Sequence, residues 1–447
     1  MKMTLSYIAS VVDGELTKSA NCNRTVEGFY TDSRVPSYEK IFLALQGERV
    51  DGNSFASALM KNGYAVMTDR KENLSLEGDA IYVHDVRSAL QCLAKHYREN
   101  DISGIPTIGI TGSVGKTTTK DMVACALSSA FKVHKTQGNF NSQVGLPQTV
   151  LATDPDVDCA VVELGMSLKG EMERISACAQ PDISVVTNIG YSHIENLGTR
   201  EAIRDEKLKI SAFSKNGSIL LLNGDEPLLR DVEYENRKIY YVSVENPHCD
   251  CYATNIIETK YGVSFDACVF GKEVLVELGV SGRHFVLNAL FALAVCDLLG
   301  IDVLIAAKSL AMYESDGKRQ HIYDKDGHVV ISDCYNASPE SMKAALSVLA
   351  SYEQRRIAVL GDMLELGSES ENLHQLVGDY TNYCADVLVT YGLHSRSINS
   401  ASRIAEKYHF NMDEKDKLFG FLKSFVKKND VVLYKASNGI KLSEIIV

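Results

Sequence analysis

The chain has 447 residues, of which 45% are hydrophobic and 23% are charged, and its formal net charge is -12. No apolar run approaches the roughly 18 residues that a membrane-spanning helix needs, and the first residues lack the apolar block of a signal peptide. The negative charge disfavours a nucleic-acid partner, because like charges repel. Composition therefore predicts a soluble, cytoplasmic protein with no stable membrane insertion, and the length suits three domains of about 100 to 200 residues each.

The first hundred residues predict a small, mixed α/β domain. Short strands are expected at 41–45 and 65–67, and a helix is expected at 54–62. We expect this N-terminal domain to span residues 1–100, the central domain 101–312 and the C-terminal domain 313–447.

The central segment predicts a parallel α/β sheet. An apolar strand at 107–111 runs into a glycine-rich turn at 112–115, and residues 116–131 have helical spacing. Further strands are expected at 159–162 and 183–187, with a helix at 200–213. Strands that alternate with helices in this way are typical of a parallel sheet covered by helices.

The last segment predicts a second, Rossmann-like α/β domain. Strands are expected at 329–333, 357–360, 387–390 and 431–434. Between the first two strands, Ser338 is suited to cap a helix that has Pro339 in its first turn.

The turn at 112–115 has the composition of a phosphate-binding loop. Its backbone amides and the helix N-terminus would cradle phosphate oxygens, Lys116 would reach the β and γ phosphates, and Thr117 would offer a hydroxyl to magnesium. The strict pattern has a glycine where this chain has Ile110, so the loop is a variant. The loop residues predicted to bind ATP are Thr111, Gly112, Ser113, Val114, Gly115, Lys116, Thr117 and Thr118.

Two further polar side chains follow neighbouring strands of the central sheet. Glu163 follows the strand at 159–162, and His193 follows the strand at 183–187. Open α/β sheets bind ligands beside the carboxyl ends of their strands, so both residues are expected near the phosphate loop. Glu163 is a candidate metal carboxylate, whereas imidazole is softer than the oxygen ligands that magnesium prefers.

Together these segments resemble the Mur ligases of peptidoglycan synthesis, and the resemblance covers almost the whole chain. The matching segments are 31–34, 42–47, 51–53, 111–119, 138–147, 163–166, 187–190 with His193, 282–289, 333–339 and 361–367. The departures are mild, with Cys334 and Ser338 standing where the family commonly has Ser and Asn.

The resemblance implies roles for individual residues. Lys116, Glu163, His193 and Lys207 would be catalytic, and Thr117, Glu163, His193 and a carbamylated Lys207 would hold Mg²⁺; Lys209 is the alternative to Lys207. Further nucleotide contacts would come from Asn139, Asn288, Arg319 and Asp333. Substrate contacts would come from Ser33, Arg34, Gln46, Gly47, Asn141, Tyr335 and Asn336.

The segments at 333–339 and 361–367 are similar to the family member that joins D-alanyl-D-alanine to UDP-N-acetylmuramoyl-tripeptide. That resemblance implies an ATP-dependent ligase that forms an acyl phosphate and then an amide. The sequence leaves the oligomeric state open, with a monomer as the default expectation. The Asp-Asn-Pro-Arg motif of the ligase that adds a diamino acid is absent. Folate-polyglutamate ligases lack a uridine-nucleotide domain of the kind expected at 1–100. From a different class, a phosphate-loop ATPase or small-molecule kinase remains the alternative, because a phosphate loop alone does not define a reaction.

Overall fold

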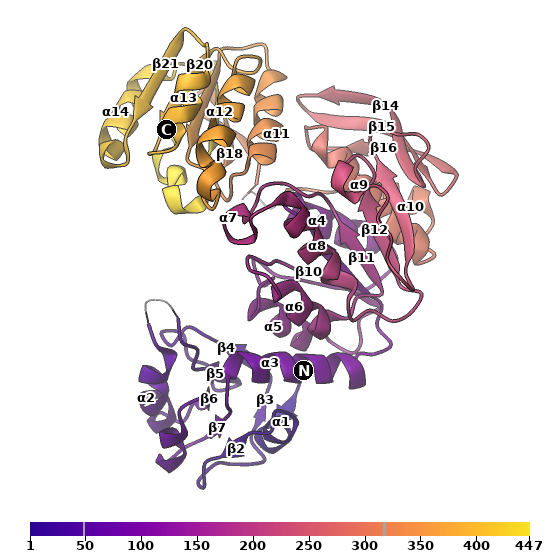
Figure 1. Cartoon of the computed structure of the whole chain (residues 1–447), viewed down its shortest axis with the longest axis vertical. Coiled ribbons are helices and arrows are strands. Elements are labelled where there is room, and N and C mark those ends of the chain that lie inside the picture. Colours follow the sequence, from indigo (N-terminus) through magenta and orange to yellow (C-terminus); the bar gives the residue numbers. More distant parts are fainter. Residues whose placement is uncertain (48–49, 316–318) are drawn as a thin grey trace.

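The computed structural model describes residues 1–47, 50–315 and 319–447. Three domains follow one another along the long axis of the molecule (Figure 1). The N-terminal domain lies at one end, the central domain occupies the middle, and the C-terminal domain packs on the central domain near helix α7.

The N-terminal domain is built on a five-stranded sheet of order β2-β7-β6-β5-β4. Its elements are β1 (Met3–Thr4), α1 (Leu5–Val11), β2 (Glu15–Leu16), β3 (Thr25–Val26), β4 (Gly28–Tyr30), β5 (Lys40–Leu43), α2 (Ala56–Lys61), β6 (Ala65–Thr68), β7 (Ala80–Tyr82) and α3 (Val86–Asn100). Strands β4 to β7 are mutually parallel, so the loops after β4 and β5 lie at the same edge of the sheet. The expected strands are confirmed, and the expected helix at 54–62 is a short 3-10 turn followed by α2.

The central domain is built on a nine-stranded sheet of order β16-β15-β14-β13-β12-β11-β8-β10-β9. Its strands are β8 (Thr107–Thr111), β9 (Val133–Lys135), β10 (Cys159–Glu163), β11 (Ile183–Val186), β12 (Ile219–Asn223), β13 (Lys238–Ser243), β14 (Cys251–Thr259), β15 (Gly262–Val269) and β16 (Lys272–Leu278). Its helices are α4 (Lys116–Leu127), α5 (Gly145–Leu151), α6 (Glu171–Ala179), α7 (Ile194–Leu197), α8 (Arg200–Leu208), α9 (His284–Leu298) and α10 (Val303–Leu310).

This sheet is parallel only in part. The strands from β9 to β14 pair in parallel, as expected from the sequence, whereas β14, β15 and β16 form an antiparallel meander. Buried and half-buried positions alternate along β15, as in a strand with one face on the core and one nearer solvent. The expected parallel sheet is therefore confirmed, and the antiparallel meander at its edge is an addition that the sequence analysis did not include.

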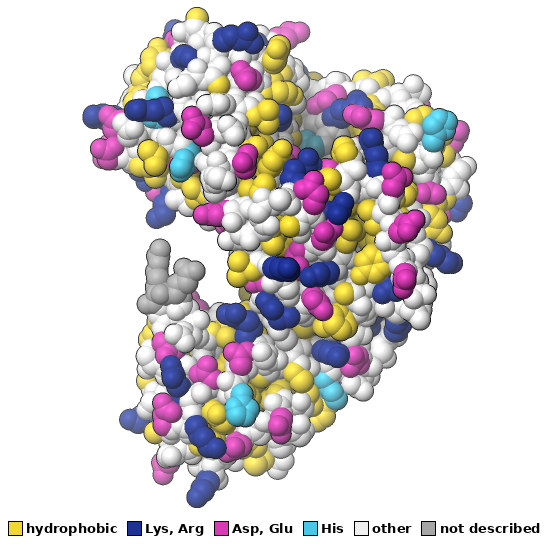
Figure 2. All heavy atoms as spheres, viewed as in Figure 1, with side chains coloured by type: hydrophobic (Ala, Val, Ile, Leu, Met, Phe, Trp, Pro, Cys, Tyr) yellow, Lys and Arg dark blue, Asp and Glu magenta, His cyan; other side chains and the backbone are white. Residues whose placement is uncertain are grey.

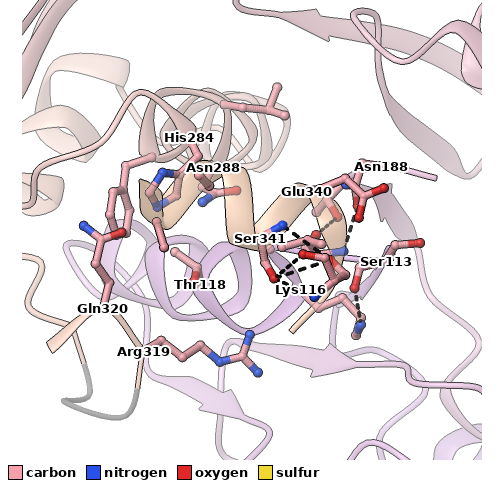
Figure 3. Close-up of a pocket in the computed structure, with 18 of the residues that line it drawn as sticks. Ser113, Lys116, Thr118, Asn188, His284, Asn288, Arg319, Gln320, Glu340 and Ser341 are labelled. Atoms are coloured by element: carbon pink, nitrogen blue, oxygen red, sulfur yellow. Dashed lines mark hydrogen bonds between the residues drawn. The ribbon is translucent and has the colours of Figure 1, made fainter. Parts of the chain in front are cut away.

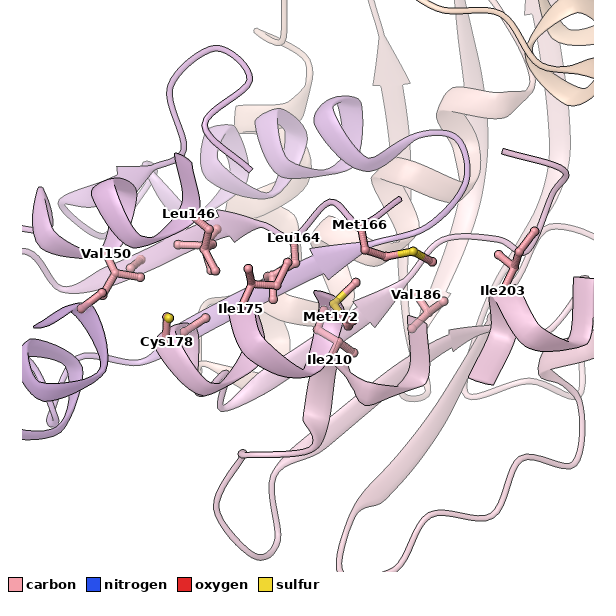
Figure 4. Packing of buried hydrophobic residues seen from close by; sticks show 14 of the residues in the cluster. Leu146, Val150, Leu164, Met166, Met172, Ile175, Cys178, Val186, Ile203 and Ile210 are labelled. Atoms are coloured by element: carbon pink, nitrogen blue, oxygen red, sulfur yellow. The ribbon is translucent and has the colours of Figure 1, made fainter. Parts of the chain in front are cut away.

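Helices cover both faces of the parallel part. On one face, α5 and α6 pack apolar side chains such as Val150 and Ile175 against the sheet (Figure 4). On the other face α9 is buried along most of its length, and Leu290, Phe291 and Leu293 have no exposed surface. Burial of each such side chain contributes roughly 1.5–3 kcal/mol. The phosphate loop thus stands on a rigid base.

The C-terminal domain contains a six-stranded sheet of order β17-β18-β22-β19-β20-β21. Its elements are β17 (His321–Lys325), β18 (His328–Asp333), α11 (Pro339–Ala350), β19 (Arg356–Gly361), α12 (Ser370–Thr381), β20 (Val387–Tyr391), α13 (Ser395–Ala401), β21 (Glu406–Phe410), α14 (Lys415–Phe425) and β22 (Val431–Lys435). All pairs are parallel except β17 with β18. Ser338 caps α11 in a capping box with Pro339 in the first turn, as predicted.

Figure 2 shows a deep notch between the N-terminal and C-terminal domains, with the central domain as its floor. Several Lys and Arg side chains lie on the central domain beside this notch. Within the described ranges, no helix is long and apolar enough to cross a membrane.

Candidate active site

The phosphate loop joins β8 to α4 and is held open by contacts with the segment after β11. Val114 N donates to Asn188 Oδ1 at 2.8 Å, and Thr187 Oγ1 donates to the Val114 carbonyl at 2.6 Å. Gly112 has a φ of +152°, and a Cβ there would lie 1.9 Å from Thr187 Oγ1, so only glycine fits. Lys116 Nζ donates to the Gly112 carbonyl at 2.8 Å, which folds its ammonium over the loop.

A cavity of about 440 Å³ lies between the loop and the C-terminal domain. Figure 3 shows Ser113, Lys116 and Asn188 of the central domain facing Glu340 and Ser341 of α11. The predicted nucleotide residues that line this cavity are Ser113, Val114, Gly115, Lys116, Thr118, Asn288, Arg319 and Asp333. Thr111 and Gly112 do not line it, because Thr111 is buried in β8 and Gly112 points its carbonyl at two lysines.

A second cavity, of about 600 Å³, is bordered by all three domains. The residues that line it include Arg87 of α3, the central residues Lys116, Thr117, Asn139, Asn141, Glu163 and His193, and the C-terminal residues Arg319, Tyr335 and Asn336. Lys116 and Arg319 border both cavities, so a triphosphate on the loop would have its terminal phosphate beside the second cavity.

Glu163 is the buried carboxylate of this second cavity. Its Oε2 accepts from Thr117 Oγ1 at 2.8 Å, its Oε1 accepts from Asn141 Nδ2 at 2.7 Å, and its amide donates to Thr136 Oγ1 at 2.9 Å. Asn141 was expected at the substrate; in this structure its amide is committed to the carboxylate. We therefore interpret Asn141 as a residue that orients Glu163.

Replacing Asn141 by alanine is expected to lower kcat about 10- to 100-fold, because Glu163 Oε1 loses the donor that fixes its rotamer. The KM values for the substrates should change little. Steady-state turnover with each substrate varied in turn measures the split between kcat and KM. A raised KM for one substrate at unchanged kcat would instead assign Asn141 to the binding of that substrate.

Lys207 and Lys209 differ sharply in their surroundings. Lys207 is 1% exposed, and its Nζ donates to the Gly112 carbonyl at 2.9 Å, the same oxygen that Lys116 contacts. Burial, and then the charge of Lys116, lower the pKa of Lys207 well below its usual range. Lys209 points away and donates to Glu206 Oε2 at 2.9 Å, which raises its pKa. Lys207 is therefore the lysine at the loop, although it borders neither cavity.

The donors here fit magnesium in part. Thr117 and Glu163 offer adjacent hard oxygens, which suits Mg²⁺. His193 lines the same cavity, with its Nδ1 2.5 Å from Glu365 Oε2, and this contact lowers the pKa of Glu365. Lys207 as an ammonium is a donor and cannot ligate a cation. In the described part of the chain, no group of three His, Cys, Asp or Glu side chains forms a metal site.

The cavity of about 440 Å³ also holds a charge pair between a half-buried carboxylate and a buried lysine. Asp333 Oδ2 lies 2.5 Å from Nζ of Lys435, which is 1% exposed. His284 lines the same cavity; burial lowers its pKa to about 4, against the opposing effect of Asp333, so its imidazole is neutral at pH 7. Arg319 stacks over the Tyr335 ring with 4.9 Å from Cζ to the centroid.

The expected substrate residues of the N-terminal domain lie away from both cavities. Ser33 and Arg34 follow β4, and Gln46 and Gly47 follow β5, at the same edge of the sheet. Arg34 binds Asp32 through Nε and Nη2 at 2.9 and 2.7 Å, and this contact lowers the pKa of Asp32 to about 2. These residues thus lie together at one sheet edge, whereas both cavities are lined by the central and C-terminal domains and, in the second cavity, by Arg87 of α3.

Sequence reasoning missed three residues that shape the site. Arg87 of α3 borders the second cavity, Asn188 holds the loop, and Glu365 contacts His193. Asn188 and Glu365 lie in the segments 187–190 and 361–367 that resemble Mur ligase motifs, so the sequence did mark them as candidates. Arg87 is a single exposed helix position, and nothing in its local sequence marks it.

Comparison with known proteins identifies the family. Residues 110–296 match the Mur ligase middle domain, and residues 318–438 match the Mur ligase glutamate ligase domain. The UDP-N-acetylmuramoyl-tripeptide–D-alanyl-D-alanine ligase of Bacillus subtilis strain 168 is 39% identical over 460 residues, which cover 100% of this chain and 98% of that protein. The enzyme of the same name from Escherichia coli K12 is 31% identical, with 100% and 98% covered.

Solved structures agree. MurF from Acinetobacter baumannii superposes with a TM-score of 0.92 at 26% identity, covering 100% of this chain and 98% of that chain. MurF from Thermotoga maritima in complex with ADP gives a TM-score of 0.84 at 28% identity, covering 94% and 96%. The chain therefore belongs to the Mur ligase family, and within it to the MurF group of ATP-dependent ligases.

Proposed function

We propose that this chain joins D-alanyl-D-alanine to UDP-N-acetylmuramoyl-tripeptide, with conversion of ATP to ADP and phosphate. The observation that carries the proposal is the cavity of about 600 Å³ that residues of all three domains border, next to a phosphate loop. Full-length relatives carry the name of this reaction, the B. subtilis protein at 39% identity. The names of these full-length relatives favour a ligase over the kinase or ATPase alternative.

The reaction begins with two anions that repel each other. The terminal carboxylate of the tripeptide attacks the γ phosphate of ATP, forming a C–O–P bond while the bond to ADP breaks. Lys116 and Arg319, which border both cavities, neutralise charge on the transferring phosphate. The product of this step is an acyl phosphate and ADP.

The amine of D-alanyl-D-alanine then attacks the acyl carbon. An amide bond forms, phosphate leaves, and one proton of the amine must pass to a base. Enclosure by the C-terminal domain, through Tyr335 and Asn336 at the second cavity, keeps water from the acyl phosphate.

Magnesium is part of this proposal. Thr117 and Glu163 would hold it, with His193 and a carbamylated Lys207 as further ligands, and the ion would neutralise phosphate charge. The lowered pKa of Lys207 favours the neutral amine that reacts with carbon dioxide, and a carbamate replaces a cation with an anionic oxygen donor.

The domain limits near residues 100 and 312 also belong to the proposal. Helix α3 ends at Asn100 and α10 ends at Leu310, and the sheets on either side of each point do not share strands. We propose that residues 1–100 hold the uridine nucleotide, with Ser33, Arg34, Gln46 and Gly47 at the sheet edge. We further propose that the protein is cytoplasmic and monomeric. Light scattering of the purified protein would check the monomeric state.

Incubation with ATP, UDP-N-acetylmuramoyl-tripeptide and D-alanyl-D-alanine tests the proposal. We expect a product whose mass is the sum of the masses of UDP-N-acetylmuramoyl-tripeptide and D-alanyl-D-alanine minus one water, together with one ADP per amide. A phosphorylated product that persists in the presence of the dipeptide, or ADP release with no amide, would favour a kinase or ATPase. Tripeptides ending in lysine and in diaminopimelate should be offered in parallel.

A further inference from the structure

One contact joins the C-terminal domain directly to a residue of the reacting cavity. Oε2 of Glu365 lies 2.5 Å from Nδ1 of His193. The His193 side chain is 22% exposed and borders the second cavity together with Lys116 and Glu163, whereas Glu365 comes from the loop that follows β19.

The backbone is unusual at both ends of this contact. His193 has a φ of +65° and Glu365 has a φ of +64°, and left-handed backbone is uncommon for residues other than glycine. Such conformations persist where the surroundings impose them, and they gather at functional sites. Here the two outliers face each other across a domain boundary.

Backbone contacts surround the pair. Glu195 N donates to the Glu365 carbonyl at 3.4 Å. Gly367 has a φ of +51°, and a Cβ at this position would lie 3.2 Å from Cα of Glu195. The loop 361–367 therefore docks closely on the segment 193–197, which includes α7 (Figure 1).

The loop that carries Glu365 is braced within its own domain. The Asp362 carboxylate accepts from the amides of Leu393 and Ser395 at 3.0 and 2.6 Å. Met363 N donates to Nε2 of the fully buried His374 at 3.0 Å, and Leu364 N donates to Ser437 Oγ at 3.0 Å. These hydrogen bonds fix Glu365 within the C-terminal domain, so Glu365 moves together with that domain.

We propose that Glu365 is a positioning residue that fixes the His193 imidazole when the C-terminal domain closes on the central domain. A carboxylate on one ring nitrogen sets the orientation of the ring and the direction of the other nitrogen. The domain that brings Arg319 and Asp333 to the nucleotide therefore also sets His193. This inference rests on the proposed ligase function, because it assigns His193 a place in that site.

The variant Glu365→Gln keeps the size of the side chain and removes its charge. Glu371→Gln, at an exposed position of the neighbouring helix α12, is the matched control. We expect kcat for amide formation to fall about tenfold in Glu365→Gln, with the KM for ATP nearly unchanged. Backbone hydrogen exchange at 193–198 in the presence of ADP should become about tenfold faster, and neither quantity should change in the control.

A cycle with His193→Ala separates positioning from a direct role. If Glu365 acts through His193, the double variant is no slower than His193→Ala alone. Additive losses, or unchanged kcat and exchange in Glu365→Gln, would overturn the inference. Because the wild-type protein is assayed in parallel, absence of any amide product from it would count against the proposed function instead, and the exchange measurement does not depend on turnover.

Discussion

Replacing Lys116 by alanine is expected to lower kcat for amide formation by about 10²- to 10³-fold or more. The Lys116 side chain borders both cavities, and its ammonium donates to the Gly112 carbonyl of the phosphate loop. In this variant, the charge that develops on the transferring phosphoryl group loses one of the two cations, Lys116 and Arg319, that border both cavities. Quenched-flow measurement of ADP formation at saturating ATP gives the rate of the phosphoryl step directly.

Lys209→Ala is the control for that prediction. Lys209 is a second lysine of the α8 region, but its ammonium is held by Glu206 and points away from the loop. It should retain nearly wild-type kcat. Full turnover by the Lys116→Ala variant would contradict the scheme, because the phosphate loop would then not act in the reaction.

Replacing Glu163 by glutamine is expected to lower kcat by roughly 10²- to 10³-fold, because a neutral amide cannot balance a divalent cation. The amide is isosteric with the carboxylate, but its NH₂ group would face the Thr117 hydroxyl or the Asn141 amide, each of which now donates to Glu163. Titration of activity with MgCl₂ measures the effect, and the midpoint should shift to higher concentration.

Glu173→Gln is the matched control, since Glu173 lies on α6 and contacts Lys209 at 3.9 Å. Its magnesium midpoint should equal that of the wild-type protein. An unchanged midpoint in Glu163→Gln would remove Glu163 from the proposed metal site, even if kcat fell.

Local signals made the phosphate loop and its supports predictable. The strand at 107–111 was expected from its apolar run and is found as β8 with the same limits. Glu163 and His193 were expected near Lys116 because both follow strands whose carboxyl ends meet at one edge, and both border its cavity. The capped start of α11 was likewise predictable from Ser338 and Pro339.

Features that depend on tertiary placement were not predictable. The meander β14 to β16 was missed although β15 alternates buried and half-buried residues, because its turns, Lys260–Tyr261 and Phe270–Gly271, lack the Asn-Gly or Asp-Gly pair that most strongly marks a hairpin. The contact of Asn141 with Glu163 arises because the loop after β9 folds back over β10. The Glu365 contact with His193 depends on how two domains pack, which no short sequence window encodes.

Transfer of an oxygen isotope tests the central claim most directly. The tripeptide substrate is prepared with ¹⁸O in its terminal carboxylate, and the phosphate released during amide formation is examined by mass spectrometry. If the carboxylate attacks the γ phosphate, the departing phosphate carries one ¹⁸O and the amide carbonyl keeps the other. Unlabelled phosphate released in step with amide formation would contradict an acyl phosphate and, with it, the chemistry assigned to this cavity.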